Sequence, residues 1–134
     1  MAKHGIRIMD SDMHVIEPPD LWERYIDPAY RDRAPRGWPG QENPSVLEIE
    51  GRVYPKSARK ASASYHEMYG RLYERYKHAV DAGYNAASQL IGMDNEGIDV
   101  AVLFPTRGLY ALASDDLDPG FAAAIARAYN DWLA

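Results

Sequence analysis

IRIMDSDMHVIEPP, residues 6–19, is the stretch on which both the fold and the function of this chain depend. Residues 6–15 are predicted to form a β-strand whose two faces alternate along the chain, and the Pro-Pro pair that follows ends any strand that reaches it. In a strand, residues two apart share a face, with Cα atoms roughly 6.6 Å apart. We therefore expect Asp10, Asp12 and His14 to line one face, with Asp12 and His14 directed at one point.

A second strand is predicted at residues 98–104, where IDVAVLF forms a nearly continuous apolar run. Runs of this kind are typical of strands that are buried on both faces of a parallel sheet. Two helices are expected between the strands: a Tyr-rich helix at residues 65–82, and a second at residues 86–96 with Asn85 as its N-cap and Gly97 just after its last turn. The order strand, helices, strand predicts a parallel βαβ unit.

Aspartates mark the expected starts of the other helices. Asp20 is expected to cap a short helix over LWERYI, and Asp27-Pro28 to begin another turn or two. Asp118-Pro119 predicts a longer helix whose apolar stripe continues to the last residue. That helix has neither a Gly stop nor a basic last turn, so we expect a truncated chain. Residues 35–44, rich in Pro and Gly, are predicted to form a loop.

A hairpin is predicted at residues 46–54, VLEIEGRVY, with its turn at Glu50-Gly51. We assign residues 41–82, which hold this hairpin and the Tyr-rich helix, to an insertion within one domain that spans residues 1–134. The tyrosines are interpreted as a packing face, and a subunit or partner interface is the alternative.

Composition restricts the classes of protein to consider. A chain of 134 residues is long enough for one domain but shorter than the roughly 250 residues of a complete (β/α)8 barrel. The absence of Cys excludes disulfides, thiolate metal sites and a Cys nucleophile, and fits a cytoplasmic location. No window approaches the roughly 18 apolar residues of a membrane span, so no membrane association is expected.

The charge is unevenly distributed along the chain. A net charge of -5 disfavours nucleic acid and anionic lipid as partners. Residues 52–78 nevertheless contain seven Lys and Arg residues against two Glu residues. We interpret this segment as a solvated helix face, and a local field that attracts an anionic substrate is the alternative.

Asp12 and His14 together supply half of a divalent metal site. Their oxygen and nitrogen donors suit Zn²⁺, Mn²⁺ or Fe²⁺, and a catalytic site needs about three protein ligands and an open position. A structural Asp-His hydrogen bond explains the same spacing. Arg107 follows the second strand at its C-terminal end, where parallel α/β folds bind ligands, and it suits a substrate carboxylate. Surface pairing of Arg107 with an aspartate of residues 115–118 is the alternative.

Three segments carry a resemblance to a known family: residues 6–36, 86–112 and 117–134. They contain, in order, D-x-D-x-H, E-P-x-D-L-W-x-R-Y, M-D-x-E-G-I-D-V-x-V-L-x-P-T and A-x-x-Y-N-D-W-L. With these motifs the chain resembles the N-terminal part of the amidohydrolase-2, or decarboxylase-type, branch of the metal-dependent amidohydrolase superfamily. The resemblance implies a partial (β/α)8 TIM barrel, in which the first two parallel strands are joined by a long helical crossover with a small hairpin insertion.

The resemblance also implies the roles of individual residues. Asp12 and His14 would occupy the first-strand ligand positions for one divalent ion, with Zn²⁺ preferred over Mn²⁺ or Fe²⁺, and Asp10 would support them. Glu17, at the rim, and Arg107 would lie near the substrate. The other ligands, and the Asp that shuttles the proton, would lie beyond residue 134.

The implied reaction is hydrolysis or non-oxidative decarboxylation of a small carboxylated substrate. The full-length form is expected to be a homo-oligomer, and the isolated chain is expected to be inactive. A non-catalytic protein-interaction or self-associating module is the alternative function.

Overall fold

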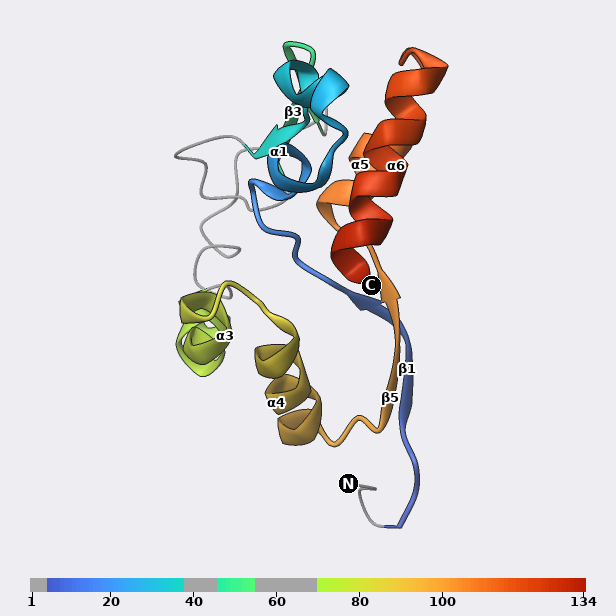
Figure 1. Cartoon of the computed structure of the whole chain (residues 1–134). Coiled ribbons are helices and arrows are strands. Elements are labelled where there is room, and N and C mark those ends of the chain that lie inside the picture. Colours follow the sequence, from blue (N-terminus) through green and yellow to red (C-terminus); the bar gives the residue numbers. More distant parts are fainter. Residues whose placement is uncertain (1–4, 38–45, 55–69) are drawn as a thin grey trace. The chain divides into compact units, whose positions relative to one another are not determined.

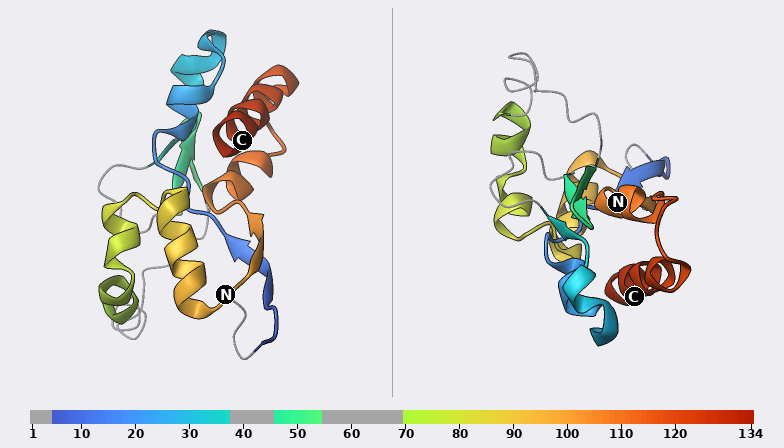
Figure 2. Two further views of the ribbon diagram at one scale, coloured as in Figure 1. Left: turned by 60° about the horizontal axis from the view of Figure 1, so that its bottom comes forward. Right: turned by 90° about the horizontal axis from the view of Figure 1, so that it is seen from above.

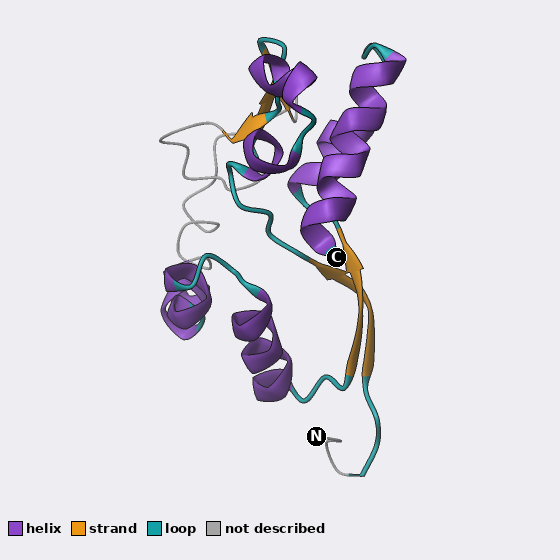
Figure 3. Cartoon of the chain, viewed as in Figure 1, coloured by secondary structure: helices purple, strands orange, loops and turns teal. Residues whose placement is uncertain are grey.

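The computed structural model describes residues 5–37, 46–54 and 70–134, and these residues form a mixed α/β structure. They divide into two compact units. The first unit comprises Met1–Val15 and Arg59–Phe104, and the second comprises Ile16–Ala58 and Pro105–Ala134. Each unit has its own sheet, parallel in the first and antiparallel in the second (Figures 1 and 3).

The sheet of the first unit consists of β1 (Met9–His14) and β5 (Val100–Phe104). The strands pair in parallel, from Met9 opposite Val100 to His14 opposite Phe104, and they lie side by side in Figures 1 and 2. The predicted parallel pairing is thus confirmed. The described residues form no closed barrel, because this sheet has two strands.

The uniform alternation predicted for residues 6–15 is wrong. The strand is shorter, and its register shifts between Asp10 and Met13. At this irregularity the Asp10 carboxylate accepts a hydrogen bond of 2.9 Å from the backbone N–H of Asp12. Because that N–H is bonded within its own strand, the regular ladder is interrupted there.

The prediction that the second strand is buried on both faces is also wrong. Val100, Val102, Leu103 and Phe104 are 38–43% exposed, because no further described strand or helix covers them fully. The strand begins at Val100, after the Asp99 carboxylate accepts a hydrogen bond of 2.9 Å from the N–H of Ile8.

Two helices of the first unit lie between the strands in sequence. α4 (Ala86–Glu96) has its predicted bounds: Asn85 Oδ1 accepts from the N–H of Ser88 at 3.0 Å, and Gly97 adopts a φ of 76°. The single helix predicted over residues 65–82 is instead interrupted at Tyr76. Residues 70–75 are helical, and α3 (Lys77–Asp81) follows as a separate turn with an ion pair of 2.8 Å between its terminal residues. Residues 65–69 lie outside the described residues.

The second unit is built around the packing of α1 (Leu21–Tyr25) on α6 (Pro119–Leu133). Their shared core includes the fully buried Trp22, whose indole N–H donates to the carbonyl oxygen of Ile125 at 3.3 Å. As predicted, Asp118 caps α6, accepting from the N–H of Phe121 at 3.0 Å. α5 (Arg107–Leu112) also packs against α6.

The other two aspartate caps differ in outcome. Asp27 accepts from the N–H of Ala29 at 2.8 Å and begins the 3-10 helix η1 (Pro28–Arg33), as predicted. Asp20 makes no side-chain cap. Its carboxylate lies 4.0 Å from Arg24, one turn further along α1, so the predicted cap is wrong.

A small antiparallel sheet completes the second unit. β3 (Leu47–Ile49) and β4 (Arg52–Tyr54) form the predicted hairpin, and its turn residues have φ of 50° and 75°. β2 (Arg36–Gly37) adds a third strand where the start of a loop was predicted. Residues 38–45 lie outside the described residues, and the boundary between the units falls inside the insertion assigned to residues 41–82. No described helix has the length and hydrophobicity needed to cross a membrane.

Candidate functional site

Asp12 and His14 lie together at the C-terminal end of β1. Asp12 Oδ1 is 3.8 Å from His14 Nε2, and the two side chains are 80% and 47% exposed. Two ligands of one tetrahedral zinc ion are roughly 3.4 Å apart, so a small side-chain rotation brings this pair to ligand distance. The donor types and their separation therefore fit two ligands of one divalent ion.

A metal site needs more ligands than this pair could supply. Across residues 5–37, 46–54 and 70–134, no three His, Cys, Asp or Glu side chains are grouped so that they could hold a metal ion. Within the described part of the chain, the metal site expected at Asp12 and His14 therefore stays a prediction.

Contacts around the pair restrict its position. The imidazole of His14 lies against the ring of Phe104, with centroids 6.2 Å apart, and the N–H of Val15 donates to the Phe104 carbonyl at 2.9 Å. The carboxylate of Asp10 accepts a hydrogen bond from the backbone N–H of Asp12. Asp10 therefore supports the strand next to the pair, and its expected role behind the metal ligands stays a prediction.

Glu17, in the second unit, is fully buried rather than at the rim where it was expected. Its Oε1 accepts from the N–H groups of Thr106 and Gly108 at 3.1 and 2.9 Å, and its Oε2 accepts from the N–H of Arg107 at 2.8 Å. A carboxylate can be buried when donors of this kind replace its water. Glu17 thus holds the start of α5 against the segment that follows β1.

Arg107 is the first residue of α5, and only 7% of it is exposed. The sequence predicted a loop after the second strand at this position, and the residue is instead helical and buried. Of the aspartates named in the alternative, a surface pair with Arg107, Asp116 pairs with Arg52 at 2.6 Å. The expected contact of Arg107 with a substrate carboxylate stays a prediction.

Gly108 and Tyr129 belong to the same cluster, and sequence reasoning did not single them out. A Cβ at Gly108 would lie 2.9 Å from Tyr129 Cε2 and 3.1 Å from Glu17 Oε1, so a side chain does not fit there. Burial raises the pKa of Tyr129 to about 12, and the negative charge of Glu17 adds to this effect. The only sequence signal for the cluster is the Gly that follows the predicted substrate arginine.

The fold and these contacts define a mixed α/β protein with an Asp–His pair at the end of a parallel strand. No protein-family model matches the chain, and no curated protein matches it significantly. The resemblance to the amidohydrolase-2 family therefore stays a prediction from the sequence motifs.

Proposed function

We propose that this chain is the N-terminal part of a metal-dependent enzyme of the amidohydrolase-2 type, acting on a small carboxylated substrate. The observation that carries the proposal is the 3.8 Å separation of Asp12 Oδ1 and His14 Nε2 at the C-terminal end of a parallel strand. Enzymes built on parallel strands and crossover helices have their catalytic residues at that end of the strands.

Asp12 and His14 would hold one divalent ion, with Zn²⁺ preferred and Mn²⁺ or Fe²⁺ as alternatives. When bound, such an ion polarises a substrate oxygen or lowers the pKa of a bound water. Asp10 restrains the backbone of Asp12, and the contact of His14 with Phe104 restrains its imidazole. Both contacts reduce the movement of the ligand pair.

The segment after β5 is proposed to bind the substrate. In the sequence, Arg107 follows Phe104 by three residues, and Glu17 follows His14 by three residues. Glu17 fixes the backbone at Arg107 through three hydrogen bonds. The guanidinium of an arginine whose backbone is fixed in this way suits the carboxylate of an acid that undergoes decarboxylation or hydrolysis.

The isolated 134-residue chain is expected to have no measurable turnover. The further ligands and the Asp that shuttles the proton are proposed to lie in sequence after residue 134, and two ligands leave an ion under-coordinated. The test is an assay with Zn²⁺, Mn²⁺ and Fe²⁺ against small aromatic and unsaturated carboxylic acids and their amides. Metal-dependent turnover by this chain, lost in Asp12→Ala and His14→Ala, would contradict the expectation. A reading frame that continues with further His and Asp ligands would support the proposal.

One observation favours a second candidate, a self-associating module. The apolar side chains of β5 are 38–43% exposed on a sheet of two strands, and open strands of this kind pair with other chains. Sedimentation velocity at increasing concentration, with Val102→Lys as the comparison, tests this candidate. Association that the substitution abolishes supports it, and a monomer at all concentrations rejects it.

A further inference from the structure

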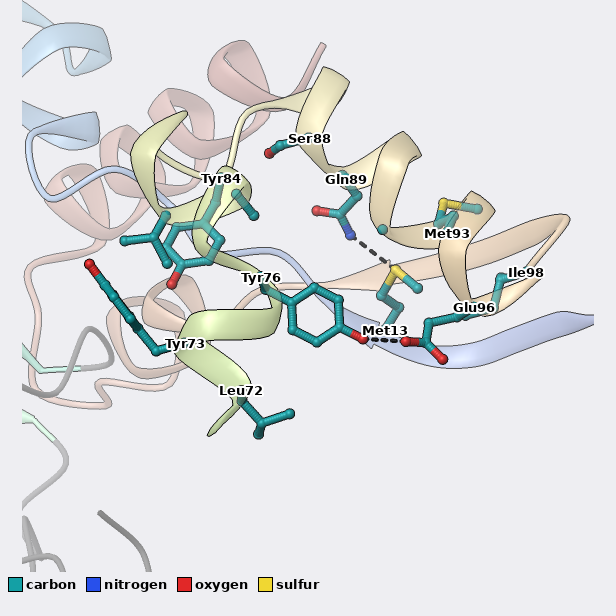
Figure 4. Close-up of a pocket in the computed structure, with 13 residues that line it drawn as sticks. Met13, Leu72, Tyr73, Tyr76, Tyr84, Ser88, Gln89, Met93, Glu96 and Ile98 are labelled. Carbon is teal, nitrogen blue, oxygen red and sulfur yellow. Dashed lines mark hydrogen bonds between the residues drawn. The ribbon is translucent and has the colours of Figure 1, made fainter. Parts of the chain in front are cut away.

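A pocket of about 360 Å³ lies within the first unit (Figure 4). Its walls come from helical residues 70–75, α3 and α4, and Met13 of β1 contributes to its lining. Small-molecule sites typically occupy roughly 300–1,000 Å³, so the pocket has the size of a site for a small ligand.

The lining is mostly apolar and aromatic. Figure 4 shows the rings of Tyr76 and Tyr84 on one side and the thioethers of Met13 and Met93 on the other. Aromatic faces and thioethers both pack well against flat rings. This lining favours a flat molecule over a flexible or strongly polar one.

The lining carries one charged side chain, and that charge is compensated. Glu96 pairs with Arg75 at 2.5 Å, and the hydroxyl of Tyr76 donates to the same carboxylate oxygen. The hydroxyl of Ser88, a buried residue, donates to the carbonyl of Asn85 at 2.8 Å. The pocket therefore presents no net charge to a ligand, which favours a neutral molecule.

Gln89 is the polar group with unused hydrogen-bonding capacity. Its amide nitrogen donates to the sulfur of Met13 at 3.0 Å, and a thioether is a weak acceptor. Among the described residues this amide makes no stronger side-chain hydrogen bond, and Figure 4 shows the amide oxygen turned toward the interior of the pocket. The amide thus offers a donor and an acceptor side by side.

We propose that this pocket binds a small, flat, uncharged molecule whose edge carries a neighbouring donor and acceptor, as in a primary carboxamide or a lactam. The edge pairs with the amide of Gln89 through two hydrogen bonds, in place of the contact with Met13. The ring packs between the tyrosines and the methionines. The inference is independent of the proposed enzyme function.

Benzamide is the probe for this site, with benzoate and toluene as matched comparisons. Binding to the full chain is measured by ¹H–¹⁵N NMR titration, following the backbone amides of α4 and the side-chain amide of Gln89. We expect benzamide to shift these signals until they saturate. It should bind about tenfold or more tightly than benzoate, which is charged, and than toluene, which has no hydrogen-bonding edge.

Gly92 provides the variant that closes the pocket. A Cβ built there meets no atom within 4 Å, so a side chain can begin at this position without a clash. Gly92→Phe is designed to fill the pocket, and Gly92→Ala is the control that leaves room for benzamide. Gln89→Leu keeps the volume and removes the amide. We expect loss of binding in Gly92→Phe, retention in Gly92→Ala and about tenfold weaker binding in Gln89→Leu. Absence of benzamide binding, binding that survives Gly92→Phe, or equal affinity for benzoate would overturn the proposal.

Discussion

Glu17 illustrates at the scale of one residue what a sequence can and cannot predict. Glu17 carries a carboxylate and directly precedes two prolines, and the sequence motifs predicted that it lies near the substrate. Its burial depends on the N–H groups of residues 106–108, about 90 positions later in the chain. A local sequence pattern does not predict a contact between residues so far apart in the chain. A position at the rim was therefore predicted for a residue that is buried.

Glu17→Gln is expected to lower the free energy of unfolding by about 2 kcal/mol. The amide retains one acceptor oxygen and turns an NH₂ group toward backbone donors, leaving buried N–H groups without an acceptor. Urea unfolding followed by tryptophan fluorescence measures the loss, since Trp22 is buried in the same unit. Asp32→Asn, the same change of charge at an exposed site of that unit, is the control and should change stability by less than about 0.5 kcal/mol. Equal effects of the two substitutions would contradict the role of Glu17.

Tyr129 makes stability depend on alkaline pH. Its pKa in the folded chain is about 12, raised from 10 mainly by burial. The unfolded chain therefore loses the phenol proton first, and it binds fewer protons than the folded chain between these two values. The stabilisation is fully present below pH 10, where both states are protonated, and it is lost as pH rises toward 12. The tyrosinate absorbance of the wild type minus that of Tyr129→Phe, measured against pH, isolates the titration of the Tyr129 phenol. A midpoint near pH 10 in this difference would contradict the raised pKa.

At the scale of elements, features with local signals were predicted and features with distant causes were not. Asn85 and Gly97 fixed both ends of α4 because an N-cap side chain and a residue with positive φ act within one turn. The register shift in β1 was not predicted, because a strand with a register shift and a regular strand can have the same pattern of residue types. The exposure of β5 was not predicted either, because an apolar run does not show which neighbours are present.

Asn85→Ala is expected to destabilise α4 by about 1 kcal/mol, because the N–H of Ser88 loses its side-chain acceptor. Hydrogen exchange at the amides of α4 measures this locally. Asn95→Ala provides the matched control, since the same substitution at an exposed position near the other end of the helix removes no cap. We expect slightly slower exchange in the control because Ala has the higher helix propensity. Faster exchange of the same size in both variants would contradict the cap assignment.

At the scale of the whole molecule, the sequence predicted the α/β class and the parallel pairing of β1 with β5. It did not predict the division into two units, which separates the hairpin from the helices within residues 41–82. That division depends on which distant segments pack together. The convergence of Asp12 and His14 was predictable because it follows from strand geometry over two residues.

The central claim is that Asp12 and His14 are ligands of one divalent ion, and a zinc titration of the 134-residue chain tests it most directly. Long-range ¹H–¹⁵N spectra report the ring nitrogens of all four histidines, so the other three serve as internal references. We predict that Zn²⁺ shifts His14 Nε2 at lower concentration than any other histidine, and that Asp12→Ala weakens this response about tenfold or more. A His14 response no earlier than that of the other histidines, or one unchanged in Asp12→Ala, would contradict the claim.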